Sequence, residues 1–184
     1  MRLGGATMGD HHTCCFTGHR PEKLPWGDQE DHPHCVALKE NMAAQLEEMY
    51  QKGYRHFLCG MARGADFYFA EAVLALRQAH PDVTLEAALP CAGQAKKWSS
   101  DDRYRWTQLV RQCDTYTLLQ QSYDRHCMLR RDRYMVDQSS AILAVFNGTR
   151  GGTQYTLNYA MDHRLDIYLF DLNHPHLPPT HLVP

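Results

Sequence analysis

At 184 residues the chain is long enough to bury one sizeable core, and a hydrophobic share of 43% with a charged share of 22% excludes wholesale disorder. Nineteen basic against 21 acidic residues give a net charge of -2, which argues against nucleic acid or anionic lipid as a partner. No window approaches the roughly 20 apolar residues of a membrane span. We therefore expect a cytoplasmic protein that makes no membrane contact.

Residues 1–12 lack the apolar segment of a signal peptide, and we expect them to form a disordered leader. Either Met1 or Met8 could be the natural start. No internal linker, repeat or low-complexity segment divides residues 13–184. This part of the chain is therefore predicted to be a single domain.

Hydrophobic periodicity predicts strands that alternate with helices along the chain. Leu38, Met42, Leu46 and Met49 recur at intervals of three and four residues, which indicates an amphipathic helix. Strands are predicted at 13–17, 54–59, 83–89, 115–119, 141–146 and 166–172, and helices at 34–52, 66–79, about 100–112, 128–137 and about 153–164. The tail from residue 173, which is rich in proline, is predicted to be irregular.

The order of these elements predicts the fold class. Segment 141–146 is an uninterrupted apolar run, as in a central parallel strand that is covered on both faces. Alternating strands and helices imply right-handed crossovers and a mostly parallel sheet. We expect an α/β, Rossmann-like three-layer sandwich with a mostly parallel central sheet.

Three glycine-containing turns, at 17–21, 60–66 and 147–153, each follow a predicted strand. In a parallel sheet they would meet at one edge, where helix amino termini and free backbone N–H groups bind anions. The candidate ligand-binding residues are Thr17, Gly18, His19, Arg20, Gly60, Arg63, Gly64, Asp66, Asn147, Gly151, Gly152 and Thr153.

Each turn alone is weak evidence, because tight turns need glycine whatever their function. Their coincidence at one edge is a stronger indication. The sequence contains neither G-x-G-x-x-G nor G-x-x-x-x-G-K-[ST], which disfavours an NAD dehydrogenase or a P-loop ATPase. Arg20, Arg63 and Arg150 stand one per turn, where they could bind phosphate or simply pair with surface carboxylates. We place Arg20 and Arg63 in the pocket and leave the arginines of segment 130–133 open.

Titratable residues in these turns have more than one reading. Asp66 could act as a base, hold a ribose hydroxyl or cap the following helix, and the cap is slightly favoured. His19 could titrate near neutral pH. The seven cysteines form no C-x-x-C pair and are read as structural thiols, so we predict no metal site.

The segments Phe16-Thr17-Gly18-His19-Arg20-Pro21 and Cys59-Gly60-Met61-Ala62-Arg63-Gly64-Ala65-Asp66, followed by Tyr134-Met135-Val136-Asp137 and Gly151-Gly152-Thr153, resemble the YpsA-like branch of the SLOG superfamily. That superfamily is named for the DNA-processing protein DprA and the LOG cytokinin-activating enzymes. The resemblance spans about residues 13–172. It implies a Rossmann-like fold whose loops line a pocket for a nucleotide-related ligand.

Three functions are compatible with this resemblance. The first is binding or sensing of a phosphate-bearing, nucleotide-derived small molecule, with no other cofactor. The second is the N-glycosidic hydrolysis of nucleotides seen in LOG-type phosphoribohydrolases. Those enzymes use P-G-G-x-G-T-x-x-E, whereas this chain has no matching proline and carries Thr156 in place of the glutamate. The third is a nucleic-acid or protein interaction module. The sequence leaves a homo-oligomer open.

Overall fold

The structure is a computed structural model, and it describes residues 12–184. The predicted leader, apart from His12, lies outside the described residues. The strands are β1 (Thr13–Gly18), β2 (His56–Cys59), β3 (Thr84–Leu89), β4 (Thr115–Leu118), β5 (Ala141–Phe146), β6 (Asp166–Asp171) and β7 (Thr180–Leu182). The helices are α1 (Pro33–Gln51), α2 (Ala65–Ala79), α3 (Ser100–Gln112), α4 (Cys127–Asp137), α5 (Gly152–Asp162) and a short 3-10 helix, η1 (Pro21–Lys23).

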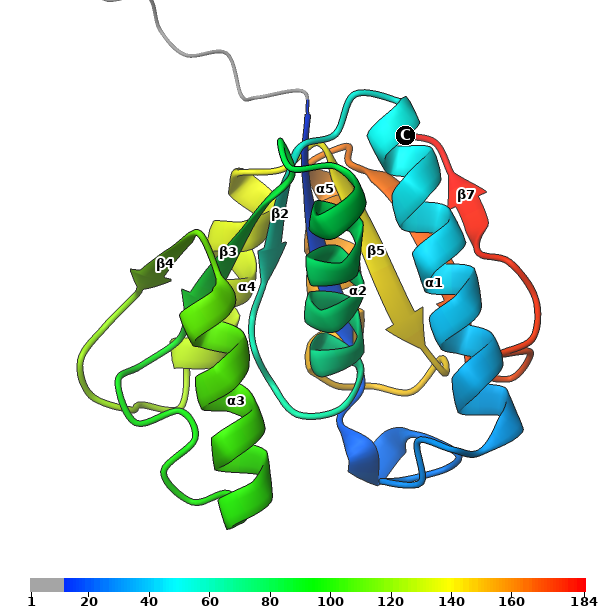
Figure 1. The fold of residues 1–184 in the computed structure, drawn as a ribbon. Coiled ribbons are helices and arrows are strands. Elements are labelled where there is room, and N and C mark those ends of the chain that lie inside the picture. The colour runs from blue at the N-terminus through cyan, green and yellow to red at the C-terminus, as the bar shows by residue number, and fades with distance from the viewer. Residues whose placement is uncertain (1–11) are drawn as a thin grey trace, which may run out of the picture.

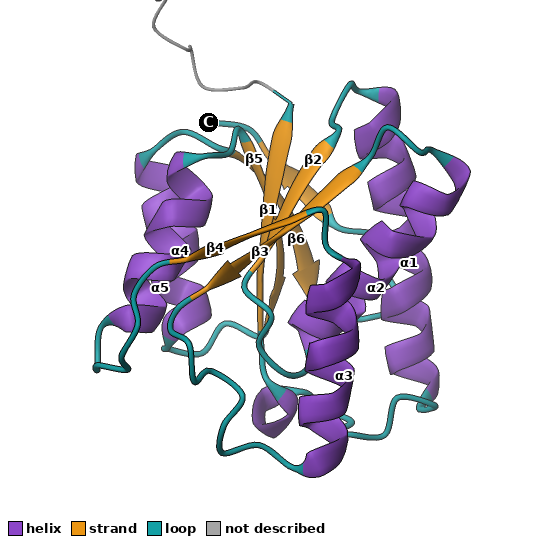
Figure 2. Ribbon diagram, turned by 60° about the vertical axis from the view of Figure 1, so that its left-hand side comes forward, coloured by secondary structure: helices purple, strands orange, loops and turns teal. Residues whose placement is uncertain are grey.

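The strands form one sheet in the order β4-β3-β2-β1-β5-β6-β7, and all neighbours are parallel except β6 and β7. Helices α1, α2 and α3 lie on one side of the sheet and α4 and α5 on the other (Figures 1 and 2). The predicted α/β, Rossmann-like three-layer fold is thereby confirmed. Its layers bury apolar side chains on both faces of the sheet, as a central parallel sheet requires.

The core divides at the sheet. On the α1–α3 side, Phe16 stacks on Phe69 with 4.6 Å between ring centroids, and both side chains are fully buried. On the α4–α5 side, Ile142 and Ala144 pack among apolar residues of both helices. Removing a fully buried ring such as Phe16 typically costs about 3–5 kcal/mol. Strands β1 and β5 are therefore a rigid frame for the loops that leave their carboxyl ends.

The structure differs from the sequence prediction mainly at two short elements. Residues 180–182 of the supposedly irregular tail form β7, which pairs antiparallel with β6. Residues 21–23, expected to be loop, form η1, because Pro21 starts the turn and the N–H of Leu24 bonds to the Pro21 carbonyl at 3.1 Å. Elsewhere the ends of elements shift by at most two residues, and Ser99 caps α3 by accepting the backbone N–H of Asp102.

The order of the strands reverses at β1. The chain adds β2, β3 and β4 on one side of β1 and then returns to place β5 on the other. Helices that follow the strands therefore leave in opposite directions from the carboxyl ends of β1 and β5, which opens a crevice between them. This switch point is where open α/β sheets bind their ligands.

Candidate functional site

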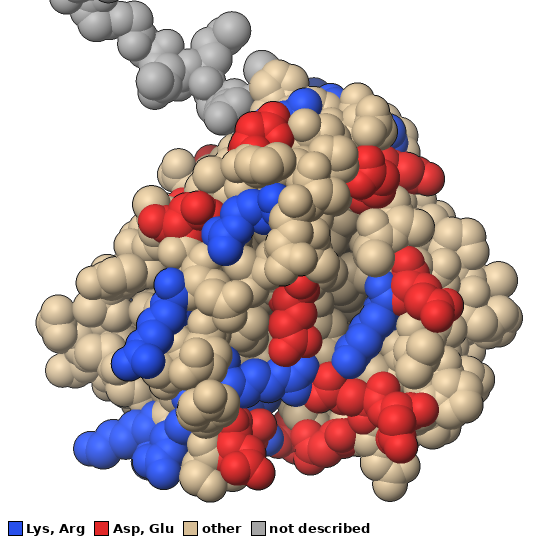
Figure 3. Space-filling view, in the orientation of Figure 1, with Lys and Arg blue, Asp and Glu red and all other residues tan. Residues whose placement is uncertain are grey.

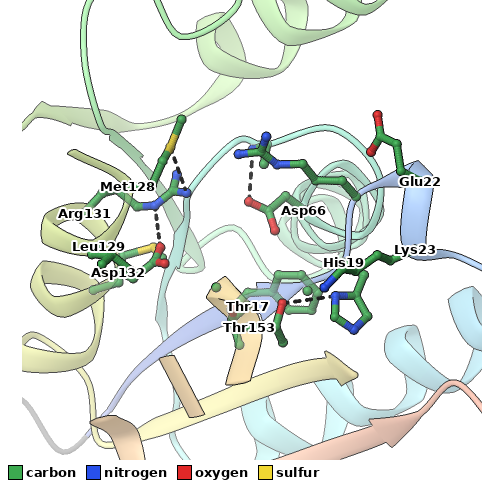
Figure 4. A pocket seen from close by; sticks show the side chains of 16 residues that line it. Thr17, His19, Glu22, Lys23, Asp66, Met128, Leu129, Arg131, Asp132 and Thr153 are labelled. Carbon is green, nitrogen blue, oxygen red and sulfur yellow. Dashed lines mark hydrogen bonds and ion pairs between the residues drawn. The ribbon is translucent and has the colours of Figure 1, made fainter. Parts of the chain in front are cut away.

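A cavity of about 280 Å³ lies at the carboxyl end of β1, beside the amino termini of α2 and α5 and one flank of α4. Figure 4 shows the side chains that line it. The lining residues are Phe16, Thr17, Gly18, His19, Arg20, Glu22, Lys23, Ala62, Asp66, Met128, Leu129, Arg131, Asp132, Met135, Gly152 and Thr153. The cavity thus occupies the switch point of the sheet.

The three predicted turns do meet at this edge, but they contribute unequally. The lining includes Thr17, Gly18, His19 and Arg20 of the first turn, Asp66 of the second, and Gly152 and Thr153 of the third. The other candidates, Gly60, Arg63, Gly64, Asn147 and Gly151, lie behind or beside the cavity wall.

Arg63 is placed differently from the expectation. Its guanidinium pairs with Glu22 and lies 3.7 Å from an Asp102 carboxylate oxygen, and it lines a separate hollow beside α3. The following Gly64 has φ +85°, a left-handed conformation that turns the chain into α2. Arg63 is therefore directed away from the main cavity and toward surface carboxylates.

His19 joins the β1 loop to the β5 loop. Its Nε2 lies 2.8 Å from Asn147 Oδ1, and its Nδ1 lies 3.4 Å from Thr153 Oγ1. Burial lowers the pKa of His19 below its ordinary value, against the raising effect of its hydrogen bond to Asn147. The Asn147 backbone nitrogen also lies 3.3 Å from Nε2, so a neutral ring can bridge Asn147 and Thr153 in either tautomer. This arrangement holds Asn147 and Thr153 in place and makes His19 a positioning residue.

Helix α5 presents its amino terminus to the cavity. Gly151 is the N-cap and supplies no side-chain cap, so the first amides of the helix are left for an external acceptor. Gly152 and Thr153, the first two helical residues, line the cavity. Together with Arg20 and Lys23, this terminus provides the positive side of the site.

A buried group of charges, Asp66 of α2 and the pair Arg131 and Asp132 of α4, also lines the cavity (Figure 4). Arg131 Nε donates to Asp132 Oδ1 at 2.7 Å, and Arg131 Nη1 donates to the Gly60 carbonyl. A Cβ at Gly60 would collide with this guanidinium, so the close approach requires glycine there. Gly60 therefore supports the site from behind the cavity wall.

The pKa of Asp66 stands out in this group. The side chain is 5% exposed, and its Oδ2 accepts the N–H of Ala62 at 3.0 Å. Burial raises the pKa of Asp66 to about 6, although the nearby positive charge of Arg131 acts to lower it. The Asp66 carboxyl can therefore change charge within the physiological pH range.

Sequence reasoning missed the contribution of α4. Met128, Arg131, Asp132 and Met135 line the cavity at helical intervals of three and four residues. Two charged residues at positions that share the buried face with apolar neighbours were the available signal, because such charges are rarely buried unless they are paired. The sequence reading considered pairing of this kind only at the surface.

Thr156, which replaces the glutamate of the hydrolase motif, points at the same charged group. Its hydroxyl oxygen lies 3.0 Å from Asp132 Oδ2 and 2.9 Å from the Gly152 carbonyl oxygen, so it can donate its one proton to either. Thr156 is 1% exposed. Threonine thus brings a carboxylate from α4 to the cavity wall next to the amino terminus of α5.

Charges on the molecular surface are mixed around this edge. In Figure 3, basic side chains gather at the lower left and acidic side chains beside them at the lower right. Within residues 12–184, no group of three or more His, Cys, Asp or Glu side chains could hold a metal ion. In the same part of the chain, no helix combines the length and the apolar character needed to cross a membrane.

Solved structures with the same fold include two DNA processing proteins. One, from Helicobacter pylori, comes from a study of its single-stranded DNA binding mode; it is 14% identical, with a TM-score of 0.58, and covers 85% of this chain. The other, DNA processing protein A from Streptococcus pneumoniae, is 12% identical, with a TM-score of 0.56 over 86% of this chain. This chain spans 64% and 50% of those two chains, respectively.

The prediction that nucleic acid is an unlikely partner is wrong. It rested on a net charge of -2, but a protein of the same fold from Helicobacter pylori binds single-stranded DNA. Binding of a strand depends on local positive groups and stacking surfaces rather than on the net charge of the whole chain.

Sequence relatives agree with the fold. The uncharacterized SPbeta prophage-derived protein YoqJ of Bacillus subtilis (strain 168) is 31% identical over 156 residues, which cover 78% of this chain and 91% of YoqJ. A UPF0398 protein of Staphylococcus epidermidis is 22% identical over 65% of this chain and 64% of its own length. The family YpsA, described as the YspA SLOG family, matches residues 14–173. The chain belongs to the YpsA SLOG family.

Proposed function

We propose that the chain binds a phosphate-bearing, nucleotide-derived small molecule in the cavity at the switch point. The observation that carries the proposal is the uncapped amino terminus of α5, which lines the same cavity as Arg20 and Lys23. Free backbone N–H groups, a helix dipole and two cationic side chains are together suited to a phosphate. The proposal retains the cytoplasmic location expected from the sequence.

The volume of the cavity limits the size of the ligand that it can enclose. A volume of about 280 Å³ lies just below the roughly 300–1,000 Å³ found for small-molecule sites. It suits one nucleotide unit better than a dinucleotide that is buried along its whole length. Apolar side chains of α4, including Met128 and Leu129, offer a wall for a base.

Calorimetric titration of the protein with AMP, GMP, ADP-ribose and NAD tests the proposal. We expect at least one mononucleotide to bind, and Lys23→Gln to weaken that binding, because Lys23 lines the cavity. Lys97→Gln is the matched control, since Lys97 is exposed and outside the cavity lining. The proposal fails if no compound binds a folded sample, or if both variants bind as tightly as wild type.

Single-stranded nucleic acid is a second candidate, favoured by the DNA-binding protein of the same fold from Helicobacter pylori. One phosphate of a strand could occupy the anion side of the cavity in place of a free nucleotide. Fluorescence titration with a labelled oligonucleotide at several salt concentrations tests this, since each neutralised phosphate contributes about -0.7 to the slope of log K against log salt. Competition by AMP would show that both ligands use one site, whereas absence of binding at low salt rules the candidate out.

Hydrolysis of an N-glycosidic bond is a third candidate, favoured by the hydrogen bond from Thr156 to Asp132. In that reaction water adds to C1′ of the ribose while the C1′–N bond breaks and the base leaves with a proton. Asp132 would stabilise the positive charge that develops at C1′. Release of free base from a nucleoside monophosphate, abolished in Asp132→Asn but retained in Asp137→Asn, would support it, and no release by wild type would reject it.

A further inference from the structure

The cavity has an acceptor that the protein itself does not use. Asp66 Oδ2 accepts the Ala62 N–H, but among residues 12–184 no donor bonds to Asp66 Oδ1. By contrast, both carboxylate oxygens of Asp132 are occupied, one by Arg131 and one by Thr156. The Asp66 carboxylate is only 5% exposed, and its second oxygen faces the cavity, where it can accept a hydrogen bond from a ligand.

A phosphate group cannot satisfy this oxygen, because an ionised phosphate offers only acceptors and repels a carboxylate. The phosphate must therefore lie away from this oxygen, against Lys23 and the first amides of α5. A ligand that fills the cavity needs an anionic end and, at some distance from it, one or more hydroxyl or amino donors.

The order of the side chains along the cavity wall indicates which ligand groups donate to Asp66. Figure 4 shows Asp66 between the side chains of α4, including Met128 and Leu129, and the group formed by His19 and Lys23. A nucleotide has the same sequence of parts, with a phosphate at one end, a base at the other and the sugar between them. The part that reaches Asp66 in this orientation is the sugar, whose hydroxyls are donors.

We infer that Asp66 accepts the 2′ and 3′ hydroxyls of a ribose, so that the site selects ribonucleotides over nucleotides without these hydroxyls. The inference rests on the proposed binding of a nucleotide-derived ligand and names the sugar that the site takes. A hydrogen bond to an ionised, buried carboxylate is among the stronger hydrogen bonds in proteins. Loss of the sugar hydroxyls leaves this carboxylate buried without a donor and lowers affinity.

The test is a comparison of each of the four common nucleoside 5′-monophosphates with its 2′,3′-dideoxy counterpart, by calorimetry on the full chain. For the nucleotide that binds wild type, we expect the dideoxy form to bind roughly 10- to 100-fold more weakly. Equal affinity of the two forms would overturn the inference and leave the proposed nucleotide site intact. Absence of binding by all eight compounds would overturn the inference, and absence of binding by ADP-ribose and NAD as well would refute the proposed function on which it rests.

Asp66→Asn assigns the selectivity to one residue. The amide oxygen can keep the bond to the Ala62 N–H, and the amide nitrogen then presents donors to the cavity in place of an acceptor. We expect the preference for ribose to fall to within about threefold of unity, while binding of inorganic phosphate is unchanged or tighter. Asp162→Asn is the matched control, because this exposed residue lies at the far end of α5. A ribose preference that persists in Asp66→Asn would contradict the assignment, and the wild-type comparison stands even if the variant is unstable.

Discussion

Two buried carboxylates near α4, Glu86 and Asp66, have pKa values that shift in opposite directions. Glu86 of β3 accepts hydrogen bonds from Thr117, Tyr134 and His56 at 2.7, 2.6 and 2.9 Å. Burial raises the pKa of Glu86, but these donors outweigh it and bring the pKa down to about 2. Asp66 has a single backbone donor, and burial raises its pKa to about 6.

The difference shows that burial alone does not identify a functional carboxylate. Both side chains have little exposed surface, 9% for Glu86 and 5% for Asp66. They differ in depth, because Asp66 is the more deeply enclosed by protein, and in the supply of donors, which is complete at Glu86 and incomplete at Asp66. A buried polar group that the protein leaves unsatisfied at a cavity is available to a ligand.

Glu86→Gln should give the largest change in stability. The folded-state pKa of Glu86 lies below its ordinary value of 4.5, so its contribution is present above pH 4.5 and is lost as the pH falls through about 2. At pH 7 we expect the free energy of unfolding to drop by about 2–3 kcal/mol. Urea unfolding measures this, and a drop below about 0.5 kcal/mol would show that the donors do not stabilise the charge.

Asp66→Asn should change stability in the opposite direction. The folded-state pKa of Asp66 lies above its ordinary value of 3.8, so its contribution is present below pH 3.8 and is lost as the pH rises through about 6. We expect the variant to be more stable than wild type by about 1–3 kcal/mol at pH 8 and nearly equal at about pH 3. Urea unfolding at the two pH values, with Asp162→Asn beside it, measures the effect. A variant less stable than wild type at pH 8 would break the comparison.

Two arginines near this edge differ in their carboxylate partners. The Arg63 guanidinium pairs with Glu22 and lies 3.7 Å from Asp102, although its Nε has no partner. By contrast, no carboxylate of residues 12–184 forms an ion pair with Arg20 in the cavity wall. We expect Arg20→Gln to weaken binding of a nucleoside monophosphate roughly tenfold. Arg63→Gln, which removes the same charge, should change it less than about twofold. If calorimetry showed a larger loss of affinity in Arg63→Gln than in Arg20→Gln, the ligand would bind in the hollow beside Arg63 instead.

The fold was largely predictable because each long element has a strong local pattern. The α1 periodicity and the apolar run of β5 depend on neighbours in sequence, and the alternation of strands and helices determines the layers. Strand β7 escaped prediction because three exposed residues, Thr180–Leu182, show no alternation and form a strand only by pairing with β6.

The site was predictable only in part, for a physical reason. Loops that follow parallel strands must meet at one edge, so Thr17 and Gly152 could be placed together from sequence. The role of Arg131 depends on how α4 is rotated about its axis against the sheet, and the local sequence pattern does not determine this rotation. The direction of Arg63 is set by partners in distant segments, Glu22 and Asp102. Side-chain direction and distant pairing are the parts that needed a structure.

Gly152→Ala should give the smallest effect and tests the backbone side of the site without changing a charge. Gly152 lines the cavity, and a Cβ placed there meets no atom within 4 Å, so alanine fits and points into space that a ligand would fill. We expect affinity for a nucleoside monophosphate to fall several-fold while the free energy of unfolding stays within about 1 kcal/mol of wild type. Gly148→Ala is the control, because Gly148 has φ +87° and lies outside the cavity lining, so it should lose stability and keep affinity. Calorimetry and thermal unfolding of both variants separate the two effects, and unchanged affinity in a stable Gly152→Ala protein would mean that the ligand does not approach the amino terminus of α5.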